Sequence, residues 1–166
     1  EVLVKFFAIV FIPFTILGQV MAPNISKAFY SEKKEEVKKK YYRIIIFSIV
    51  SSLIIGAISY ISFILFGPYI LKKFDLVLLN LLMIGFLCLL PFRAIGLITN
   101  LGFITPIGKA KIITYPLFIG GILNVLTDLI LIKYGFIYII YNTFILNILN
   151  IIFTNILFQR ELRRLI

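Results

Sequence analysis

The sequence predicts an all-α integral membrane protein with about five transmembrane helices. Of its 166 residues, 61% are hydrophobic and only 14% are charged, and the mean hydropathy is +1.09. Soluble domains contain closer to half apolar residues, so a water-soluble domain would be unable to bury this much apolar surface. The apolar residues form continuous runs of about 20, the length that an α-helix needs to cross a bilayer. Strands of a transmembrane barrel would instead need about ten residues of alternating polarity, which excludes that fold class.

The first predicted span covers residues 6–26, which contain no charged side chain. Pro13 lies inside this span and predicts a kink, because neighbouring helices in a membrane satisfy the backbone groups that a proline frees. The sequence begins with Glu1 rather than a methionine, and its first apolar stretch lacks the basic start and cleavage site of a signal peptide. We therefore expect residues 1–166 to be a single transmembrane region and a fragment of a longer transporter.

The segment of residues 27–43 is the most basic part of the chain. Its basic residues are Lys27, Lys33, Lys34, Lys38, Lys39, Lys40 and Arg43. Ser31 is positioned to cap a short helix with glutamates in its first turn and lysines in its last, the order that the helix dipole favours. The expected salt bridges of this helix are Glu35–Lys39 and Glu36–Lys40. We predict a solvated helix on the membrane surface near anionic lipid.

The remaining apolar runs predict four further spans. They cover residues 44–66, 76–107, 112–132 and 136–158. The second span ends at Gly67-Pro68, and the polar segment 72–75 follows it. The third run is long for one span and contains Arg93. Short polar segments at 108–111 and 133–135 separate the last three spans, which predicts turns at both places.

The distribution of lysine and arginine predicts the orientation, because short loops rich in these residues stay in the cytoplasm. Alternation of the spans puts the 27–43 loop, the turn with Lys109 and Lys111, and the arginine-rich C-terminal end on one side. That side holds about twelve basic residues, against about three in the opposite turns. We predict a multi-pass protein of the cell membrane with loop 27–43 and the C-terminal end in the cytoplasm. This topology accounts for the net charge of +10, so the lipid bilayer rather than nucleic acid is the predicted partner.

Residues typical of catalytic sites are scarce. The chain has no histidine, which is the commonest metal ligand and general base near neutral pH, and its single cysteine, Cys88, is unable to form a disulfide within the chain. The sequence contains no Walker motif, dinucleotide-binding glycine pattern or catalytic triad spacing. We therefore predict that the protein is not an enzyme and binds no cofactor, apart from a coupling proton or sodium ion.

Arg93 is the sharpest candidate for a functional residue. An arginine at the centre of a span disfavours insertion by roughly 2.5 to 3.5 kcal/mol, which the surrounding apolar residues offset. An arginine that faces a water-filled cavity would bind an anion such as a phosphate or pyrophosphate. In the alternative interpretation the span ends near Phe92, so that Arg93 reaches the membrane interface and residues 94–107 lie along the surface.

Asn124 and Asp128 lie four residues apart on one face of the fourth predicted span. The carboxylate of Asp128 would bind a proton or sodium ion, or would be paired with Lys133 or hydrated at the membrane rim. Together with Arg93, these two residues are the candidate substrate-binding residues. The asparagines of the fifth span are expected to form hydrogen bonds between helices, and no site is assigned to them. They are Asn142, Asn147, Asn150 and Asn155.

Several short motifs occur in the order found in one family of transporters. Residues 21–30, with the sequence Met-Ala-Pro-Asn-Ile-Ser-Lys-Ala-Phe-Tyr, end a span before the lysine-rich loop. Gly108-Lys109 precedes the fourth span, and the pattern from Asn124 to Asp128 is followed by Lys133-Tyr134-Gly135. This series resembles the polysaccharide biosynthesis exporters, the O-antigen type flippases, which belong to the same superfamily as the multidrug and toxic compound extrusion transporters.

The resemblance implies both an architecture and a function. Transporters of this family have two repeated bundles of about six helices, so the resemblance implies that the five spans form the later part of the second bundle. The parent protein would flip a polyprenyl-pyrophosphate-linked oligosaccharide across the membrane by alternating access. Arg93 would contact the pyrophosphate or an acidic sugar. The implied partners are this lipid-linked oligosaccharide and the rest of the parent transporter chain.

Two other functions stay open on the sequence alone. The first is a cation-coupled multidrug exporter in which Asp128 is the coupling site. A paired acidic residue deep in the first span would favour it, and the sequence has none there. The second is a non-catalytic scaffold subunit, in which Arg93 would form a salt bridge with another chain. A membrane-embedded glycosyltransferase is disfavoured because the outer turns are too short to hold an acceptor site.

Overall fold

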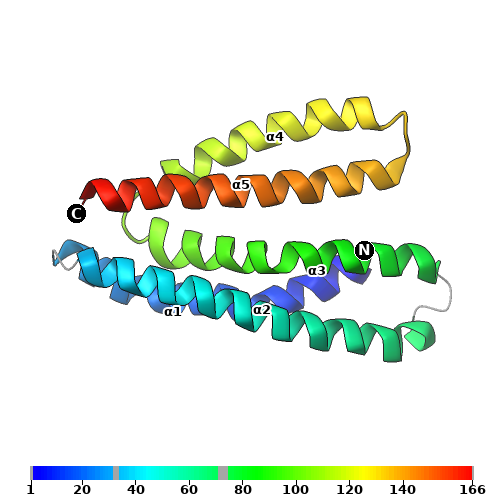
Figure 1. The fold of residues 1–166 in the computed structure, drawn as a ribbon, viewed down its shortest axis with the longest axis horizontal. Coiled ribbons are helices and arrows are strands. Elements are labelled where there is room, and N and C mark those ends of the chain that lie inside the picture. Colours follow the sequence, from blue (N-terminus) through cyan, green and yellow to red (C-terminus); the bar gives the residue numbers. More distant parts are fainter. Residues whose placement is uncertain (1, 32–33, 71–74, 166) are drawn as a thin grey trace.

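A computed structural model describes residues 2–31, 34–70 and 75–165 of the chain. These residues form helices joined by short connections, and the described part contains no strand (Figure 1). In chain order the elements are α1 (Val2–Tyr30), α2 (Lys34–Ile70), α3 (Leu76–Thr99), the π-helical segment η1 (Asn100–Ile104), α4 (Lys111–Leu131) and α5 (Phe136–Leu165). The prediction that the chain is all-α is therefore confirmed for the described residues.

Five helical stretches in the described residues are long and apolar enough to cross a membrane. They are Phe7–Tyr30, Glu35–Tyr69, Leu76–Ile104, Lys111–Leu131 and Ile137–Arg164. Many large apolar side chains on these helices are exposed in the chain by itself, especially along α2 and α4. Such surfaces are unfavourable in water and favourable against lipid, which is consistent with a membrane protein. α1 continues through Pro13 as one helix.

The basic segment 27–43 does not form the separate surface helix that the sequence predicted. Its first part completes α1, and the residues from Lys34 onward are the first turns of α2, which continues for 37 residues to Ile70. The hydroxyl of Ser31 donates to the carbonyl of Ala28 at 3.3 Å, so Ser31 belongs to the end of α1. The charged segment and the apolar segment after it both favour helix, and no glycine or proline separates them.

The predicted pair between Lys40 and Glu36 is present at 2.7 Å, whereas Glu35 contacts Lys38 at 3.8 Å instead of Lys39. Several predicted features, namely Glu1, Lys33 and the polar residues Lys72 and Lys73, lie outside the described residues.

The third predicted span is a continuous helical rod from Leu76 to Ile104. The Asp75 carboxylate caps its start by accepting hydrogen bonds from the backbone amides of Val77 and Leu78, at 2.9 and 3.3 Å. The rod ends in η1, where the amide of Thr105 donates to the carbonyl of Asn100 at 3.0 Å, a bond of the i to i−5 type.

The path of this rod does not support the alternative in which the span ends near Phe92 and residues 94–107 form a separate segment along the surface. Ala94, Ile98 and Phe103 are fully buried against neighbouring helices. The helix continues past Arg93 for eleven residues to Ile104 because its following turns contribute to the core of the chain. Arg93 is therefore an internal residue of a long helix and not the end of one.

The helices form two groups on either side of α3 (Figure 1). α1 and α2 pack on one side, while α4 and α5 form an antiparallel hairpin on the other, with α5 next to α3. Gly18 of α1 and Gly102 of η1 allow the closest approach in the first group. A Cβ added to Gly102 would lie 3.2 Å from the Gly18 carbonyl oxygen, and one added to Gly18 would lie 3.0 Å from the Leu101 Cβ. The backbones of α1 and η1 are thus in direct contact.

Three aromatic rings and one amide join α2, α3 and α5 near one end of the molecule. The ring of Tyr41 packs edge-on against Phe103 and Phe158, with centroids 5.4 and 5.1 Å away. Its hydroxyl donates to Asn155 Oδ1 at 2.8 Å, and the same oxygen accepts from Thr99 Oγ1 at 3.2 Å. This contact fixes the position of α5 relative to the first group of helices.

We expect Tyr41→Phe to lower the free energy of unfolding by about 1 kcal/mol, the usual net value of one hydrogen bond, because the ring contacts are retained. Thermal unfolding of the purified protein in detergent measures this change as a lower midpoint. Tyr42→Phe is the matched control, since Tyr42 is 41% exposed and its hydroxyl forms no hydrogen bond among the described residues, although its ring packs edge-on against Tyr41. A midpoint for Tyr41→Phe equal to that of Tyr42→Phe would show that the hydrogen bond is not stabilising.

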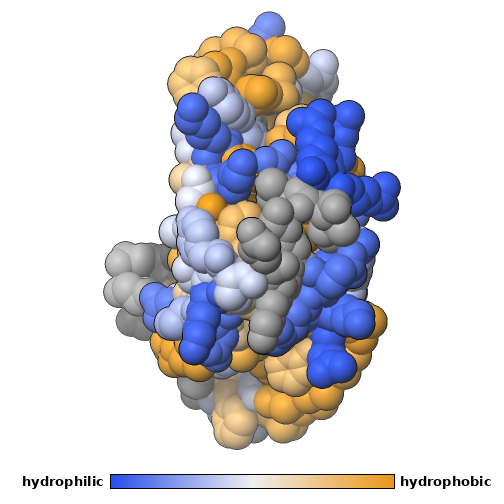
Figure 2. Space-filling view, turned by 90° about the vertical axis from the view of Figure 1, so that its left-hand side faces the viewer, coloured by the Kyte–Doolittle hydropathy of each residue, from blue (hydrophilic) through white to orange (hydrophobic). Residues whose placement is uncertain are grey.

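The basic residues gather at one end of the helix bundle. Figure 2 shows this end as a hydrophilic face flanked by apolar surface. It combines the end of α1, the start of α2, the turn before α4 and the end of α5. Lys109 in that turn forms an ion pair with Glu161 of α5 at 2.7 Å. The described residues of segment 27–43, the turn 109–111 and the C-terminal arginines thus lie at the same end of the bundle.

Candidate functional site

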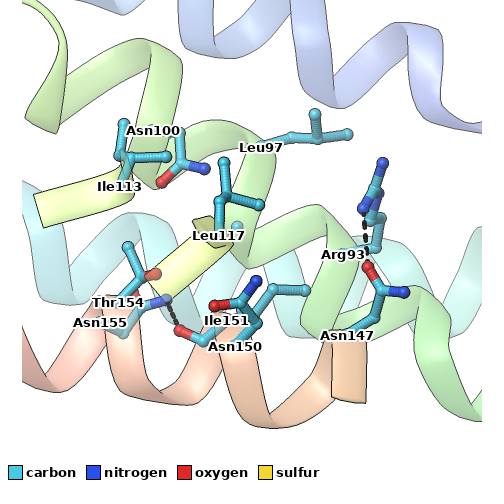
Figure 3. A pocket seen from close by; sticks show the side chains of 11 residues that line it. Arg93, Leu97, Asn100, Ile113, Leu117, Asn147, Asn150, Ile151, Thr154 and Asn155 are labelled. Carbon is cyan, nitrogen blue, oxygen red and sulfur yellow. Dashed lines mark hydrogen bonds between the residues drawn. The ribbon is translucent and has the colours of Figure 1, made fainter. Parts of the chain in front are cut away.

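A polar cleft lies between the α3–η1 rod, α4 and α5 (Figure 3). Its volume is about 200 Å³. The polar residues that line it are Arg93, Asn100, Asn147, Asn150, Thr154 and Asn155. Apolar side chains of α4, such as Leu117, form the remaining wall. We call this space the Arg93 cleft.

The polar lining follows from helical spacing on two facing helices. On α5, Thr143, Asn147, Asn150 and Thr154 follow one another at intervals of four, three and four residues, which puts them on one face. On the rod, Asn100 follows Arg93 by seven residues, or about two turns, so both side chains share a face as well. Figure 3 shows Arg93 and Asn100 of the rod on one side of the cleft, and Asn147, Asn150 and Thr154 of α5 on the other. A polar stripe on each helix therefore meets a polar stripe on its neighbour.

The guanidinium of Arg93 contacts one side chain of α5 and one of α1, and it forms one hydrogen bond among the described residues. Its Nη1 donates to Asn147 Oδ1 at 3.3 Å, and the Asn147 amide is oriented by donating to the Thr143 carbonyl at 2.8 Å. The ring of Phe11 lies 6.0 Å from the Arg93 Cζ atom, close enough for a weak cation–π contact. Among the described residues no carboxylate forms an ion pair with Arg93. An arginine with five N–H donors is thus left with capacity to bind an anion.

Two asparagines of the cleft differ in how their amides are used. Asn155 uses both atoms of its amide, since its oxygen accepts from two side chains and its Nδ2 donates to the Ile151 carbonyl at 2.8 Å. Asn100 has a buried Oδ1 with no hydrogen-bond partner among the described residues. Asn155 therefore has a structural role, as predicted for the asparagines of this span, while Asn100 does not share it.

A second polar group joins α4 to α5 further from the basic end. Its members are Asn124, Thr127, Asp128, Asn142 and Thr143, which we call the Asp128 cluster. The Asn142 amide nitrogen lies within hydrogen-bond distance of three oxygens: Thr127 Oγ1 at 2.6 Å, Asp128 Oδ1 at 2.9 Å and Asn124 Oδ1 at 3.4 Å. Among the described residues, Asp128 therefore accepts a hydrogen bond from Asn142 and does not form the ion pair with Lys133 that the sequence suggested.

The three residues predicted from the sequence lie near one another but do not line one common pocket. Arg93 lines the Arg93 cleft, and Asn124 lines an adjoining pocket of about 180 Å³ that shares Asn147 and Asn150 with it. Asp128 lines neither space but is joined to α5 within the Asp128 cluster. Asn100, Asn147 and Asn150 were not predicted as site residues. For the two residues of α5, the four-three-four spacing was the available signal in the sequence.

Comparison of the chain with protein family models, with curated proteins and with solved structures found no match. The fold and the site therefore define only a structural class of protein. The described residues form an all-helical chain with five helices long and apolar enough to cross a membrane, and a cleft with one arginine and several amides lies between three of them.

Proposed function

We propose that this chain is part of a multi-pass transporter of the cell membrane whose substrate is a polyprenyl-pyrophosphate-linked oligosaccharide, flipped by alternating access. The observation that carries this proposal is the Arg93 cleft, in which an arginine without a carboxylate partner among the described residues faces a row of amides. The order of motifs along the chain, which resembles the polysaccharide exporters, supports the choice of substrate.

The depth of Arg93 along its helix favours a functional role. Arg93 precedes the end of η1 by eleven residues, which corresponds to about 16 Å at 1.5 Å per residue. The hydrocarbon core of a bilayer is about 30 Å thick, so an arginine at this distance from the basic end would lie near the midplane. Charged side chains at that depth are rare and generally belong to substrate or ion pathways.

The chemistry of the cleft suits a ligand with an anionic and a neutral polar part. A guanidinium binds phosphate oxygens through parallel N–H bonds, which matches a pyrophosphate. The amides of Asn147 and Asn150 both donate and accept hydrogen bonds, as sugar hydroxyls require. The cleft is formed by α3, α4 and α5 alone, and we propose that other helices of the parent transporter complete its walls. The positive-inside rule puts the basic end in the cytoplasm.

The Asp128 cluster supports coupling to a proton or a sodium ion. One amide group has two hydrogens, yet three oxygens surround the Asn142 nitrogen within 3.4 Å. The Thr143 hydroxyl also lies 3.5 Å from Asn124 Oδ1, so the donors and acceptors of the cluster are nearly matched, whereas the charge of the Asp128 carboxylate has no ion-pair partner among the described residues. A proton on Asp128, or a cation held by these oxygens, would balance the cluster.

We expect Asp128→Asn in the complete protein to reduce gradient-driven transport at least tenfold, because the variant retains the shape of the side chain but loses the charge that attracts a cation. Transport into proteoliposomes with and without a proton or sodium gradient measures this effect. Glu161→Gln is the matched control, since it neutralises a carboxylate at the basic end outside the cluster. If the two variants respond equally to the gradients, Asp128 is not the coupling site.

Complementation tests the proposed function. The complete wild-type protein is expressed in a bacterial mutant that lacks its surface-polysaccharide flippase, and restored surface glycan is measured together with the amount of protein in the membrane. Restored glycan is the expected result. Absent glycan at a normal protein level, together with increased drug resistance of the cells, would instead identify a cation-coupled drug exporter, the alternative that the Asp128 cluster favours. Absence of both effects would favour a scaffold subunit.

A further inference from the structure

The side chain of Asn100 contains an acceptor that the protein leaves unused. Its Oδ1 is buried and has no hydrogen-bond partner among the described residues, although the residue lines the Arg93 cleft. Figure 3 shows the amide pointing from η1 toward the cleft. More than nine in ten buried polar groups in proteins are paired, so an orphaned oxygen beside a polar cavity indicates a partner from outside the chain.

The backbone of Asn100, in contrast, is fully engaged. Its N–H donates to the carbonyls of Gly96 and Leu97, and its own carbonyl accepts the π-type bond from Thr105 at 3.0 Å. The neighbouring Thr99 makes the hydrogen bond between helices, to Asn155 at 3.2 Å. Asn100 therefore contributes no described side-chain bond to helix packing. It begins a π-helical segment, a local distortion that is frequent at functional sites.

The chemistry and position of this oxygen define the group that it binds. A carbonyl oxygen only accepts hydrogen bonds, so its partner carries an O–H or N–H donor. Asn100 is seven residues beyond Arg93 on the same face, or about 10 Å along the helix toward the basic end. An anion bound by Arg93 would therefore have its neutral polar part beside Asn100 if the ligand extended in that direction.

We infer that Asn100 is a specificity-determining residue that accepts a hydrogen bond from a hydroxyl or amide of a sugar unit while Arg93 holds the anionic group of the same ligand. This inference rests on the proposed function. It adds that the ligand has a hydrogen-bond donor in its sugar part, at a distance from the anionic group that matches the separation of Asn100 and Arg93. Asn100 would thereby favour ligands in which a sugar with O–H or N–H donors lies next to the anion over ligands that consist of the anion alone.

Binding of two small probes to the purified complete protein in detergent tests the inference. Inorganic pyrophosphate presents only the anion, whereas N-acetylglucosamine 1-phosphate presents an anion together with hydroxyl and amide donors. We expect Asn100→Leu to weaken binding of the sugar phosphate about five- to tenfold, the loss of one hydrogen bond, and to leave pyrophosphate binding unchanged. Arg93→Ala is expected to weaken binding of both probes. Asn80→Leu, on the same helix but outside the cleft, is the matched control.

A second measurement separates recognition from folding. Asn100 is partly exposed, but its Oδ1 is buried and unpaired, and leucine at this position removes that unsatisfied acceptor, so Asn100→Leu is expected to raise the thermal unfolding midpoint. Asn80 accepts a hydrogen bond from the Tyr60 hydroxyl at 3.4 Å, and Asn80→Leu has no such reason to be stabilising. A lower midpoint for Asn100→Leu would indicate a structural role for Asn100 and would overturn the inference.

The outcomes distinguish this inference from the function on which it rests. If both probes bind and Asn100→Leu leaves both affinities unchanged while Arg93→Ala weakens them, the anion site stands and the role of Asn100 is overturned. If neither probe binds the wild-type protein, the proposed anion recognition by Arg93 fails, and the inference about Asn100 fails with it.

Discussion

Arg93→Ala in the complete protein is expected to reduce transport between tenfold and a hundredfold. Hydrogen bonds to charged groups contribute about 1.5 to 3 kcal/mol each, and every 1.4 kcal/mol is a factor of ten. Among the described residues, Arg93 is the only arginine that lines the cleft, and its guanidinium forms one hydrogen bond, to Asn147. Removing it takes away the positive charge that binds the anion, and the amides beside it carry no charge to replace it.

The measurement is restored surface glycan in the complementation assay, normalised to the amount of protein in the membrane. Arg93→Lys is the informative companion variant, because it retains the charge but loses the planar fork that binds two phosphate oxygens at once. We expect its activity to lie between those of wild type and Arg93→Ala. Arg160→Ala controls for the loss of a basic residue, since Arg160 is exposed near the basic end. Unchanged glycan with Arg93→Ala would refute the proposed role of Arg93.

The existence and approximate positions of the five long helices were predictable because they depend on the length of the apolar runs, which can be read directly from the sequence. A run of about 20 apolar residues favours a lipid-facing helix whatever its neighbours are. Helix ends were less predictable. The charged residues from Lys34 onward extend α2 well before the predicted start at 44, because hydropathy marks where apolar sequence begins and not where helical backbone begins.

The candidate site was predictable only where a single residue is unusual by itself. Arg93 and Asp128 are charges within apolar runs, and each is conspicuous without knowledge of its neighbours. Asn147 and Asn150 are ordinary in a chain rich in asparagine, and their role depends on α5 facing the Arg93 side of α3. That pairing of faces is a tertiary property. The spacing of polar residues on α5 indicates a polar face, but not which helix it meets.

The backbone conformation of the π-helical segment was likewise not predictable from the local sequence. Nothing in residues 100–104 distinguishes them by composition from the α-helical residues before them. The segment becomes meaningful in the fold, where Asn100 faces the cleft and Gly102 contacts the backbone of α1 at Gly18. One short distortion thus combines a candidate binding residue with a close backbone contact between α1 and the α3–η1 rod.

Gly102→Leu is expected to destabilise the protein by about 3 kcal/mol or more and to lower its amount in the membrane. Overpacked sites usually cost 1 to 3 kcal/mol, and the high end applies here because the nearest atom to the new Cβ is a backbone oxygen, that of Gly18 at 3.2 Å, which is unable to rotate away. Gly121→Leu is the matched control, since a Cβ at Gly121 has no atom within 4 Å. Thermal unfolding and membrane yield of both variants give the comparison. If Gly102→Leu unfolds at the same temperature as Gly121→Leu, the contact between α1 and η1 is not a tight one. A large difference would mean that the position of η1, and with it the direction of Asn100, is fixed by the backbone of α1.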